Sequence, residues 1–251
     1  MRESCTIIGA TSGIGSSTAL KFAEKGYDLV ITGRDITELE IISKNIKDQY
    51  NVSVKSIIFE LNQSDESIDK LFHQIKFLEQ SAIVITIGLL ETEYDSKYQS
   101  YNSLLDSNFV GPALIIQKFR ELLMDNLKSF NGNISLIVIS SVAGDKGKSS
   151  NYLYGATKSA LTTYLSGIRQ DFYHISKNIH ICTVIPGFVD TEMTRGMSLP
   201  KFLVSSKSHV ADRIFDAFEK KREIIYIKKI WRIIMLLINL MPEYIFKKLK
   251  L

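Results

Sequence analysis

The chain has 251 residues, of which 45% are hydrophobic and 23% are charged. This balance excludes a disordered chain, because disorder requires few apolar residues and a high net charge. The formal net charge of +4 is too small an excess to indicate a nucleic-acid partner.

Short apolar runs, rich in Ile and Val, alternate along the chain with longer helical patterns. In chain order the runs are Thr6–Ile8, Asp28–Thr32, Val54–Phe59, Ala82–Ile87, Ile134–Ser140, Ile179–Ile185 and Ile224–Ile227. The segments between them predict helices at 13–26, 36–50, 64–80, 98–126, 152–177 and 208–222. Runs without apolar–polar alternation are typical of strands buried on both faces of a parallel sheet. We therefore expect an α/β fold: a single-domain Rossmann fold with a doubly wound, seven-stranded parallel sheet flanked by helices.

We expect one domain over 1–227 and a helical tail over 228–251 that belongs to it. A predicted strand begins almost at the first residue, so no signal peptide is expected. Cys5 and Cys182 lie in apolar runs and are interpreted as buried thiols. The four histidines lack the spacing of a zinc site, so no metal site is predicted.

A glycine-rich turn follows the first run and precedes an apolar helix. Glycines at a strand-to-helix turn let the backbone approach a pyrophosphate, and the helix N-terminus supplies N–H groups and a favourable dipole. The alternative is a tight turn that binds nothing. The cofactor contacts predicted here are Gly9, Thr11, Ser12, Gly13, Ile14 and Gly15.

The end of the second run bears on the choice of cofactor. An acidic residue there would accept a hydrogen bond from the ribose 2′-OH and repel a 2′-phosphate. Gly33 occupies that position, and Arg34 follows with a guanidinium that can pair with a phosphate. We therefore expect NADP(H), with NAD(H) as the alternative because Asp35 could bind the ribose or orient Arg34. A solvated surface charge is the other interpretation of Arg34.

Tyr154 and Lys158 are four residues apart at the start of a predicted helix. This spacing places the phenol and the ammonium on one face. A positive charge about 4 Å away is worth roughly 4 kcal/mol at an effective dielectric of 20, or about 3 pK units before desolvation offsets some of it. Such a shift would bring the phenol pKa towards working pH, where acid–base catalysis is most effective.

Two further motifs support this pair. Ser140-Ser141-Val142-Ala143-Gly144 ends a buried run, with Ser141 thirteen residues before Tyr154, and Ser107-Asn108-Phe109-Val110-Gly111 lies farther upstream. Together with the G-x-x-x-G-x-G spacing of the turn, these motifs resemble the short-chain dehydrogenase/reductase family over about residues 1–225.

The resemblance implies roles for four catalytic residues. Ser141 binds the substrate oxygen, Tyr154 exchanges the proton, and Lys158 lowers the phenol pKa and binds the nicotinamide ribose. Asn108 organises a water that connects Lys158 to solvent. The alternative is that these four polar residues have structural roles and match the family spacing by chance.

The resemblance also implies a loop over the nicotinamide after the sixth run. Its predicted contacts are Pro186, Gly187, Val189 and Thr191. For Thr191 the alternative is a helix N-cap, with Asp190 as a rival cap. Departures from the family pattern are Ile85 and Thr86, which stand where two amide side chains are usual, and Asn62, which stands where an aspartate commonly contacts adenine. We keep Asn62 and Gly88 as predicted cofactor contacts.

The implied activity is NADP(H)-dependent interconversion of a carbonyl and a secondary alcohol, on an apolar or lipid-linked substrate. A keto-sugar reductase within a lipid-linked sugar epimerisation is one alternative. A catalytically decayed nucleotide-binding regulatory or scaffold protein is an alternative from another class. The family resemblance suggests a homodimer or homotetramer.

The tail places the apolar segment Ile233–Met241 between basic residues. This segment is too short to span a bilayer, which needs about 20 residues. Its two interpretations are a helix that covers the substrate cleft or a dimer interface, and an amphipathic helix in a membrane interface. The expected location is the cytoplasm, with association to the inner face of a membrane under the second interpretation.

Overall fold

The structure is a computed structural model that describes residues 3–61, 65–90, 98–130 and 132–249. Its main feature is a parallel sheet with the strand order β3-β2-β1-β4-β5-β6-β9. The strands are β1 (Ser4–Ile8), β2 (Asp28–Gly33), β3 (Val54–Ile58), β4 (Ala82–Ile85), β5 (Ile134–Ile139), β6 (Ile179–Ile185) and β9 (Ile224–Tyr226). The predicted fold class and all seven strands are confirmed, and the predicted strand ends differ by two residues at most.

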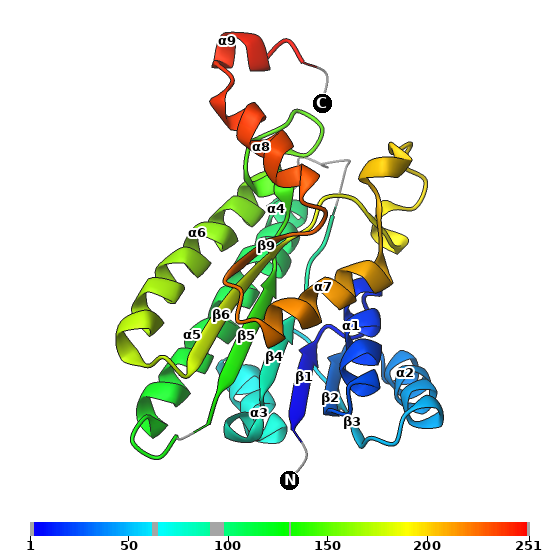
Figure 1. Cartoon of the computed structure of the whole chain (residues 1–251), viewed down its shortest axis with the longest axis vertical. Helices are drawn as coiled ribbons and strands as arrows, with labels where there is room; N and C mark the ends of the chain where they lie inside the picture. Colours follow the sequence, from blue (N-terminus) through cyan, green and yellow to red (C-terminus); the bar gives the residue numbers. More distant parts are fainter. Residues whose placement is uncertain (1–2, 62–64, 91–97, 131, 250–251) are drawn as a thin grey trace.

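Helices cover both faces of the sheet (Figure 1). One face carries α1 (Gly13–Glu24), α2 (Ile36–Gln49) and α7 (Lys207–Glu219). The other carries α3 (Asp65–Ile75), α5 (Gly111–Asn126) and α6 (Tyr152–Ile175). Helices on both faces are what the right-handed crossovers of a doubly wound sheet require.

The central strands are mostly apolar because both faces of the sheet are buried there. Neighbouring residues in a strand point to opposite faces, so Ile7 and Val84 join one hydrophobic cluster while Ile8 and Ile83 join the other. All four side chains are fully buried. Burying one such side chain contributes about 1.5–3 kcal/mol relative to leaving it exposed.

The helix predicted at 98–126 is divided into three parts. A π-helical turn, Asp106–Val110, separates α4 (Tyr98–Leu105) from α5. In this turn the Gly111 N–H donates to the Asp106 carbonyl, five residues back. Pro112 has no N–H to donate to the Asn108 carbonyl four residues back. Proline therefore accounts for the local change of pitch.

The chain after β6 adds a strand pair that the sequence did not predict and the helical tail that it did. β7 (Val189–Asp190) and β8 (Ser205–Ser206) form a small parallel pair. The tail forms α8 (Ile230–Leu240) and α9 (Glu243–Phe246), which lie above the carboxyl ends of β5 and β6 in Figure 1. Over the described part of the chain, no helix combines the length and the apolar character needed to cross a bilayer.

Candidate active site

A cavity of about 620 Å³ lies at the carboxyl ends of the strands. The chain crosses from one side of β1 to the other between β3 and β4, and ligands of open α/β sheets bind at such a switch point. Twelve of the predicted site residues line the cavity: Thr11, Ser12, Gly13, Ile14, Gly88, Ser141, Tyr154, Lys158, Pro186, Gly187, Val189 and Thr191.

Four predicted residues lie outside the cavity lining. Gly9 and Gly15 belong to the turn beneath it, and Asn108 is buried behind it. Arg34 is exposed directly after β2. Asn62 lies outside the described residues.

The glycine-rich turn is built for close approach of a ligand. Gly9 has a φ of +92°, a conformation that L side chains rarely adopt. Ser12 caps α1 by accepting a hydrogen bond from the Gly15 N–H at 2.9 Å, and no acidic residue stands in the first turn of α1. The helix dipole is therefore not offset by a carboxylate, and the turn fits a pyrophosphate.

Thr86 joins this turn to the end of β4. Its hydroxyl lies 2.8 Å from the Gly9 carbonyl oxygen and 3.0 Å from that of Ile8, and it accepts from the Ser12 hydroxyl at 3.3 Å. Ile85 is buried in the core. The two departures from the family pattern thus leave a braced sheet, with a hydroxyl making the hydrogen bonds to the turn.

Tyr154, Lys158 and Ser141 converge on one wall of the cavity. The side chains of Ser141 and Tyr154 share a hydrogen bond, and the Ser141 hydroxyl also accepts from the Ala143 N–H at 3.1 Å. The Lys158 ammonium donates to the Ile139 carbonyl at 3.3 Å. The adjacent Ser140 bonds Thr162 of α6 at 2.6 Å, which fixes the end of β5 against the helix that carries Tyr154.

The electrostatics of the pair differ from our expectation. Burial raises the pKa of Tyr154, and the hydrogen bond from Ser141 lowers it by less. Burial also lowers the pKa of Lys158 to about 8. The Lys158 ammonium lies 5.9 Å from the centroid of the Tyr154 ring, and desolvation outweighs the shift that the spacing predicted instead of offsetting only part of it. The spacing predicted a lowered pKa for the Tyr154 phenol, and for the protein alone this prediction is wrong.

Asn108 lies in the π-helical turn and is fully buried. Its amide donates to the Leu89 carbonyl at 2.8 Å and accepts from the Leu89 N–H at 3.0 Å. These two bonds fix the chain that leaves β4. A Cβ at Gly88 would lie 3.1 Å from the Asn108 amide oxygen and 3.2 Å from the Lys158 ammonium, so the three residues meet at the floor of the site.

The loop after β6 is held from both sides. The Pro186 carbonyl accepts from the Val142 N–H at 3.0 Å. On its outer side the Trp231 ring of α8 lies over Gly187, where an added Cβ would come 2.0 Å from the indole nitrogen. Thr191 both lines the cavity and begins the short helix Glu192–Thr194, so the N-cap alternative and the cavity position hold together.

Arg34 and Asp35 take different positions after β2. The Asp35 carboxylate caps α2 by accepting from the Thr37 and Glu38 N–H groups at 2.7 and 3.3 Å. It is therefore engaged in the helix N-terminus, while the Arg34 side chain is exposed.

The sequence did not single out three residues that shape the cavity. Lys148 and Asn151 line it between β5 and α6, and Trp231 packs behind the loop after β6. Asn151 directly before α6 had the signal of a helix cap. Nothing in the sequence pattern separated Lys148 from the other lysines.

The matching family model is described as short chain dehydrogenase and covers residues 3–200. The 11-beta-hydroxysteroid dehydrogenase-like 2 of Arabidopsis thaliana is 29% identical over 251 residues, covering 95% of this chain and 78% of that protein.

Two solved structures share the fold at 18% identity. A short-chain dehydrogenase from Sphingobium yanoikuyae in complex with NADPH has a TM-score of 0.78 and covers 96% of this chain and 97% of its own. A short-chain dehydrogenase/reductase from Burkholderia phymatum in complex with NAD has a TM-score of 0.79, with 94% and 92% covered. The chain belongs to the short-chain dehydrogenase family and is an NAD(P)-dependent dehydrogenase/reductase.

Proposed function

We propose that the protein interconverts a carbonyl and a secondary alcohol with NADP(H), using Tyr154 as general acid and base. The observation that carries this proposal is the hydrogen bond between Tyr154 and Ser141 on the wall of a cavity that also contains Lys158. When bound, the nicotinamide supplies or accepts the hydride.

Each residue has one part in the proposed reaction. Ser141 donates a hydrogen bond to the substrate oxygen and orients it. Tyr154, whose pKa is raised by burial, holds its proton at neutral pH and passes it to that oxygen during reduction. Lys158 carries a positive charge below pH about 8 and favours the phenolate left behind.

Replacing Tyr154 with Phe tests the assignment. We expect Tyr154→Phe to lower kcat by at least about 100-fold, the usual contribution of a positioned acid–base group. Thermal unfolding and NADPH binding should stay close to the wild type, because only the hydroxyl is removed. A variant that keeps its turnover would contradict the proposal. NADPH binding with no turnover in the wild type would instead favour the decayed, scaffold alternative.

The preference for NADP(H) rests on Arg34. With Asp35 capping α2, the charged group free to face a 2′-phosphate at this strand end is the Arg34 guanidinium. We expect a higher kcat/KM for NADPH than for NADH, and Arg34→Ala should reduce that ratio about tenfold or more, as for loss of a charge-assisted hydrogen bond. Arg195→Ala, on a different loop, is the matched control. A wild-type preference for NADH would refute the choice.

An apolar substrate fits the lining of the cavity. Val142, Phe188, Met193 and Leu199 line the same cavity as Tyr154. The Arabidopsis relative bears the name of a hydroxysteroid dehydrogenase, which is in line with an apolar body. Comparing bulky ketones with keto-sugars in a cofactor-oxidation assay tests this part. A preference for keto-sugars would support the epimerisation alternative.

The tail has two faces with different roles. Trp231 and Met235 are buried against the site, whereas Ile233, Leu236 and Leu237 are more than half exposed. Lys229, Arg232, Lys247 and Lys248 are exposed around them. A basic, apolar face complements an anionic lipid surface, so we place this face in the membrane interface.

Co-sedimentation with vesicles tests this contact. The wild type should bind vesicles containing phosphatidylserine more than neutral vesicles, and Leu236→Ser/Leu237→Ser should bind less. Equal binding of both proteins to vesicles would contradict the proposed membrane contact. It would favour the alternative that a second copy of the chain covers this face. The predicted homodimer or homotetramer and the predicted cytoplasmic location stay predictions, and light scattering would measure the first.

A further inference from the structure

The loop between β5 and α6 carries three charged residues with different surroundings. The Asp145 carboxylate accepts a hydrogen bond from the Tyr226 hydroxyl of β9 at 3.0 Å. The Lys146 ammonium pairs with Glu243 of α9 at 3.0 Å and lies 4.8 Å from the centroid of the Phe246 ring. β9 therefore holds the first of these charges, and the tail holds the second.

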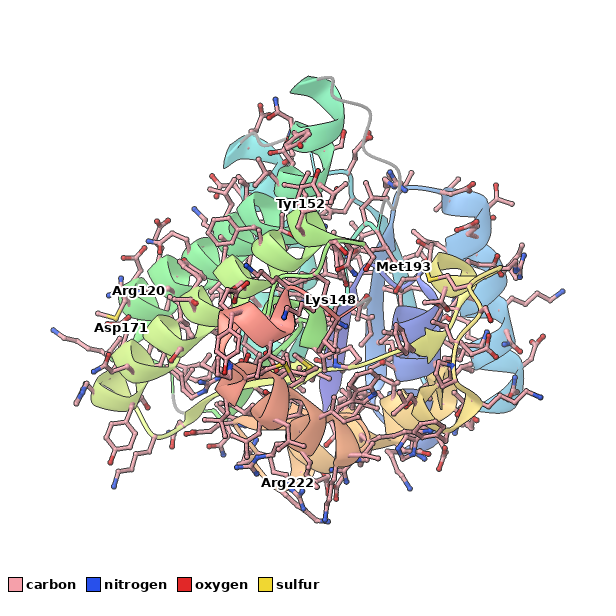
Figure 2. All side chains as sticks on the ribbon, turned by 90° about the horizontal axis from the view of Figure 1, so that it is seen from above. Arg120, Lys148, Tyr152, Asp171, Met193 and Arg222 are labelled. Atoms are coloured by element: carbon pink, nitrogen blue, oxygen red, sulfur yellow. The ribbon has the colours of Figure 1, made fainter. Side chains whose placement is uncertain are left out.

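Lys148 instead lines the cavity. Figure 2, which looks down on this end of the molecule, shows it near the centre of the view, between Tyr152 of α6 and Met193 beyond the loop after β6. Within the described residues, its ammonium has no hydrogen bond and no carboxylate at ion-pair distance. Glu192, another residue of the lining, is paired with Arg195.

An unpaired ammonium in this position is costly. Much of the lining around it is apolar, and burial lowers the pKa of Lys148. Desolvating a charge without a partner is unfavourable. A bound ligand that carries one negative charge would offset this cost.

Asn151 provides a second unsatisfied group in the same part of the cavity. Its amide oxygen is buried and has no hydrogen-bond donor. Asn151 is therefore a neighbour of Lys148 in the lining that supplies no carboxylate to it, and the ammonium of Lys148 remains the charged group offered to a ligand.

We propose that Lys148 binds a carboxylate of the substrate, while the carbonyl of the same molecule lies at Ser141 and Tyr154. One ammonium matches a monoanion, and the apolar lining between the two points takes a carbon chain. The substrate class is therefore an oxo acid with an apolar body. This inference rests on the proposed function, and it specifies that the substrate carries a carboxylate at one end.

Ligand binding tests the carboxylate site without turnover. Trp231 is the only tryptophan of the chain, and its ring contacts Phe188 of the cavity wall at a centroid distance of 5.4 Å, so its fluorescence reports occupancy. We expect decanoate to bind about tenfold or more tightly than decanol, as for one charge-assisted hydrogen bond. Lys148→Met should abolish that preference, and Lys148→Arg should retain it.

Lys177→Met is the matched control, because it removes an exposed lysine at the opposite end of the sheet and should keep the preference. Equal or absent binding of decanoate and decanol in the wild type, or an unchanged preference in Lys148→Met, overturns the inference.

Turnover separates this inference from the proposed function. The ratio of kcat/KM for 5-oxodecanoate to that for its methyl ester should exceed about ten in the wild type and fall towards one in Lys148→Met. If decanoate binds through Lys148 but neither ketone is reduced, the proposed function fails and the anion site stands. If both ketones are reduced with equal efficiency, the proposed function stands and the inference fails.

Discussion

Lys158 illustrates how burial sets the charge of one side chain at the site. Its ammonium is almost fully buried, its pKa is lowered to about 8, and its partner within the described residues is the Ile139 carbonyl. A carbonyl oxygen offers a hydrogen bond but no full negative charge. The charge that the proposed mechanism assigns to Lys158 is therefore lost only one or two pH units above neutrality.

This titration predicts a pH profile. The kcat/KM for NADPH reports groups of the free enzyme, and its value should fall about tenfold per pH unit above pH 8 as Lys158 loses its proton. The phenol does not interfere, since burial raises the pKa of Tyr154. Steady-state rates between pH 6 and pH 10 would measure this fall, the alkaline limb of the pH profile.

The variants of Lys158 and Lys148 identify the group responsible. Arginine stays protonated throughout this range, so the limb should disappear in Lys158→Arg. It should remain in Lys148→Met, because the second lysine lies at the substrate end of the cavity. A limb that persists in Lys158→Arg would show that another group titrates.

At the scale of elements, α8 supports the site from outside. Trp231 and Met235 form a small cluster with Val142 and Ile185, and the indole N–H donates to the Leu203 carbonyl at 3.3 Å. The helix thus holds together the end of β5, the end of β6 and the segment before β8. The apolar residues on its other face, Ile233, Leu236 and Leu237, are more than half exposed.

Two alanine variants of α8 should therefore differ in stability. Trp231→Ala should lower the free energy of unfolding by about 3–5 kcal/mol, the cost of removing a large aromatic side chain from a packed cluster. It should also lower kcat/KM, since the loop after β6 loses its support. Leu237→Ala, on the exposed face of the same helix, should change stability by no more than about 0.5 kcal/mol. Urea unfolding measures both, and equal effects would mean that α8 is not anchored by its indole.

An element could be predicted from the sequence when neighbouring residues determine it, and could not when distant residues do. The central strands were predictable because both faces of the sheet are buried there, which leaves nearly continuous apolar runs. The π-helical turn at Asp106–Val110 was not, since its apolar periodicity continues across the change of pitch. The packing of Trp231 on Gly187 joins residues 44 positions apart, and no local pattern encodes such a contact.

The candidate site was predictable where it depends on spacing along one element. Tyr154 and Lys158 share a helix, and Ser141 lies two residues beyond the end of β5. The phenol pKa was not predictable, because desolvation depends on every atom that covers the cavity. Lys148 escaped notice for a similar reason: its significance comes from its position in the cavity lining, which several segments of the chain form together.

At the scale of the whole molecule, the two ends of the sheet differ in chemistry. The carboxyl ends of the strands carry the cavity, whereas the opposite end carries a hydrogen-bonded cluster around His180. The Lys221 ammonium donates to the Ser135 hydroxyl oxygen at 3.1 Å, and His180 bonds that hydroxyl and the Arg222 carbonyl at 3.1 and 3.0 Å. These contacts fit a neutral imidazole that accepts from Ser135 and donates to the Arg222 carbonyl.

This cluster predicts how stability depends on pH. Burial lowers the pKa of His180 below its usual 6.5, so between the folded and unfolded pKa values the unfolded chain binds more protons. The free energy of unfolding should then fall as the pH drops below about 6.5. Urea unfolding at pH 7.5 and pH 5.5 should show a smaller loss in His180→Gln than in the wild type. His209→Gln, at an exposed position, should behave as the wild type, and an equal loss in all three proteins would exclude His180 as the cause.

The contact between Gly187 and Trp231 constrains how chimeric enzymes can be made from this chain. A donor tail without an indole at this position would leave a void over the turn. A donor turn with any side chain in place of Gly187 would collide with the native indole. In a chimera, the C-terminal segment and the turn after β6 must therefore come from the same parent. A junction placed between them would keep each segment whole but would separate Gly187 from its matching indole.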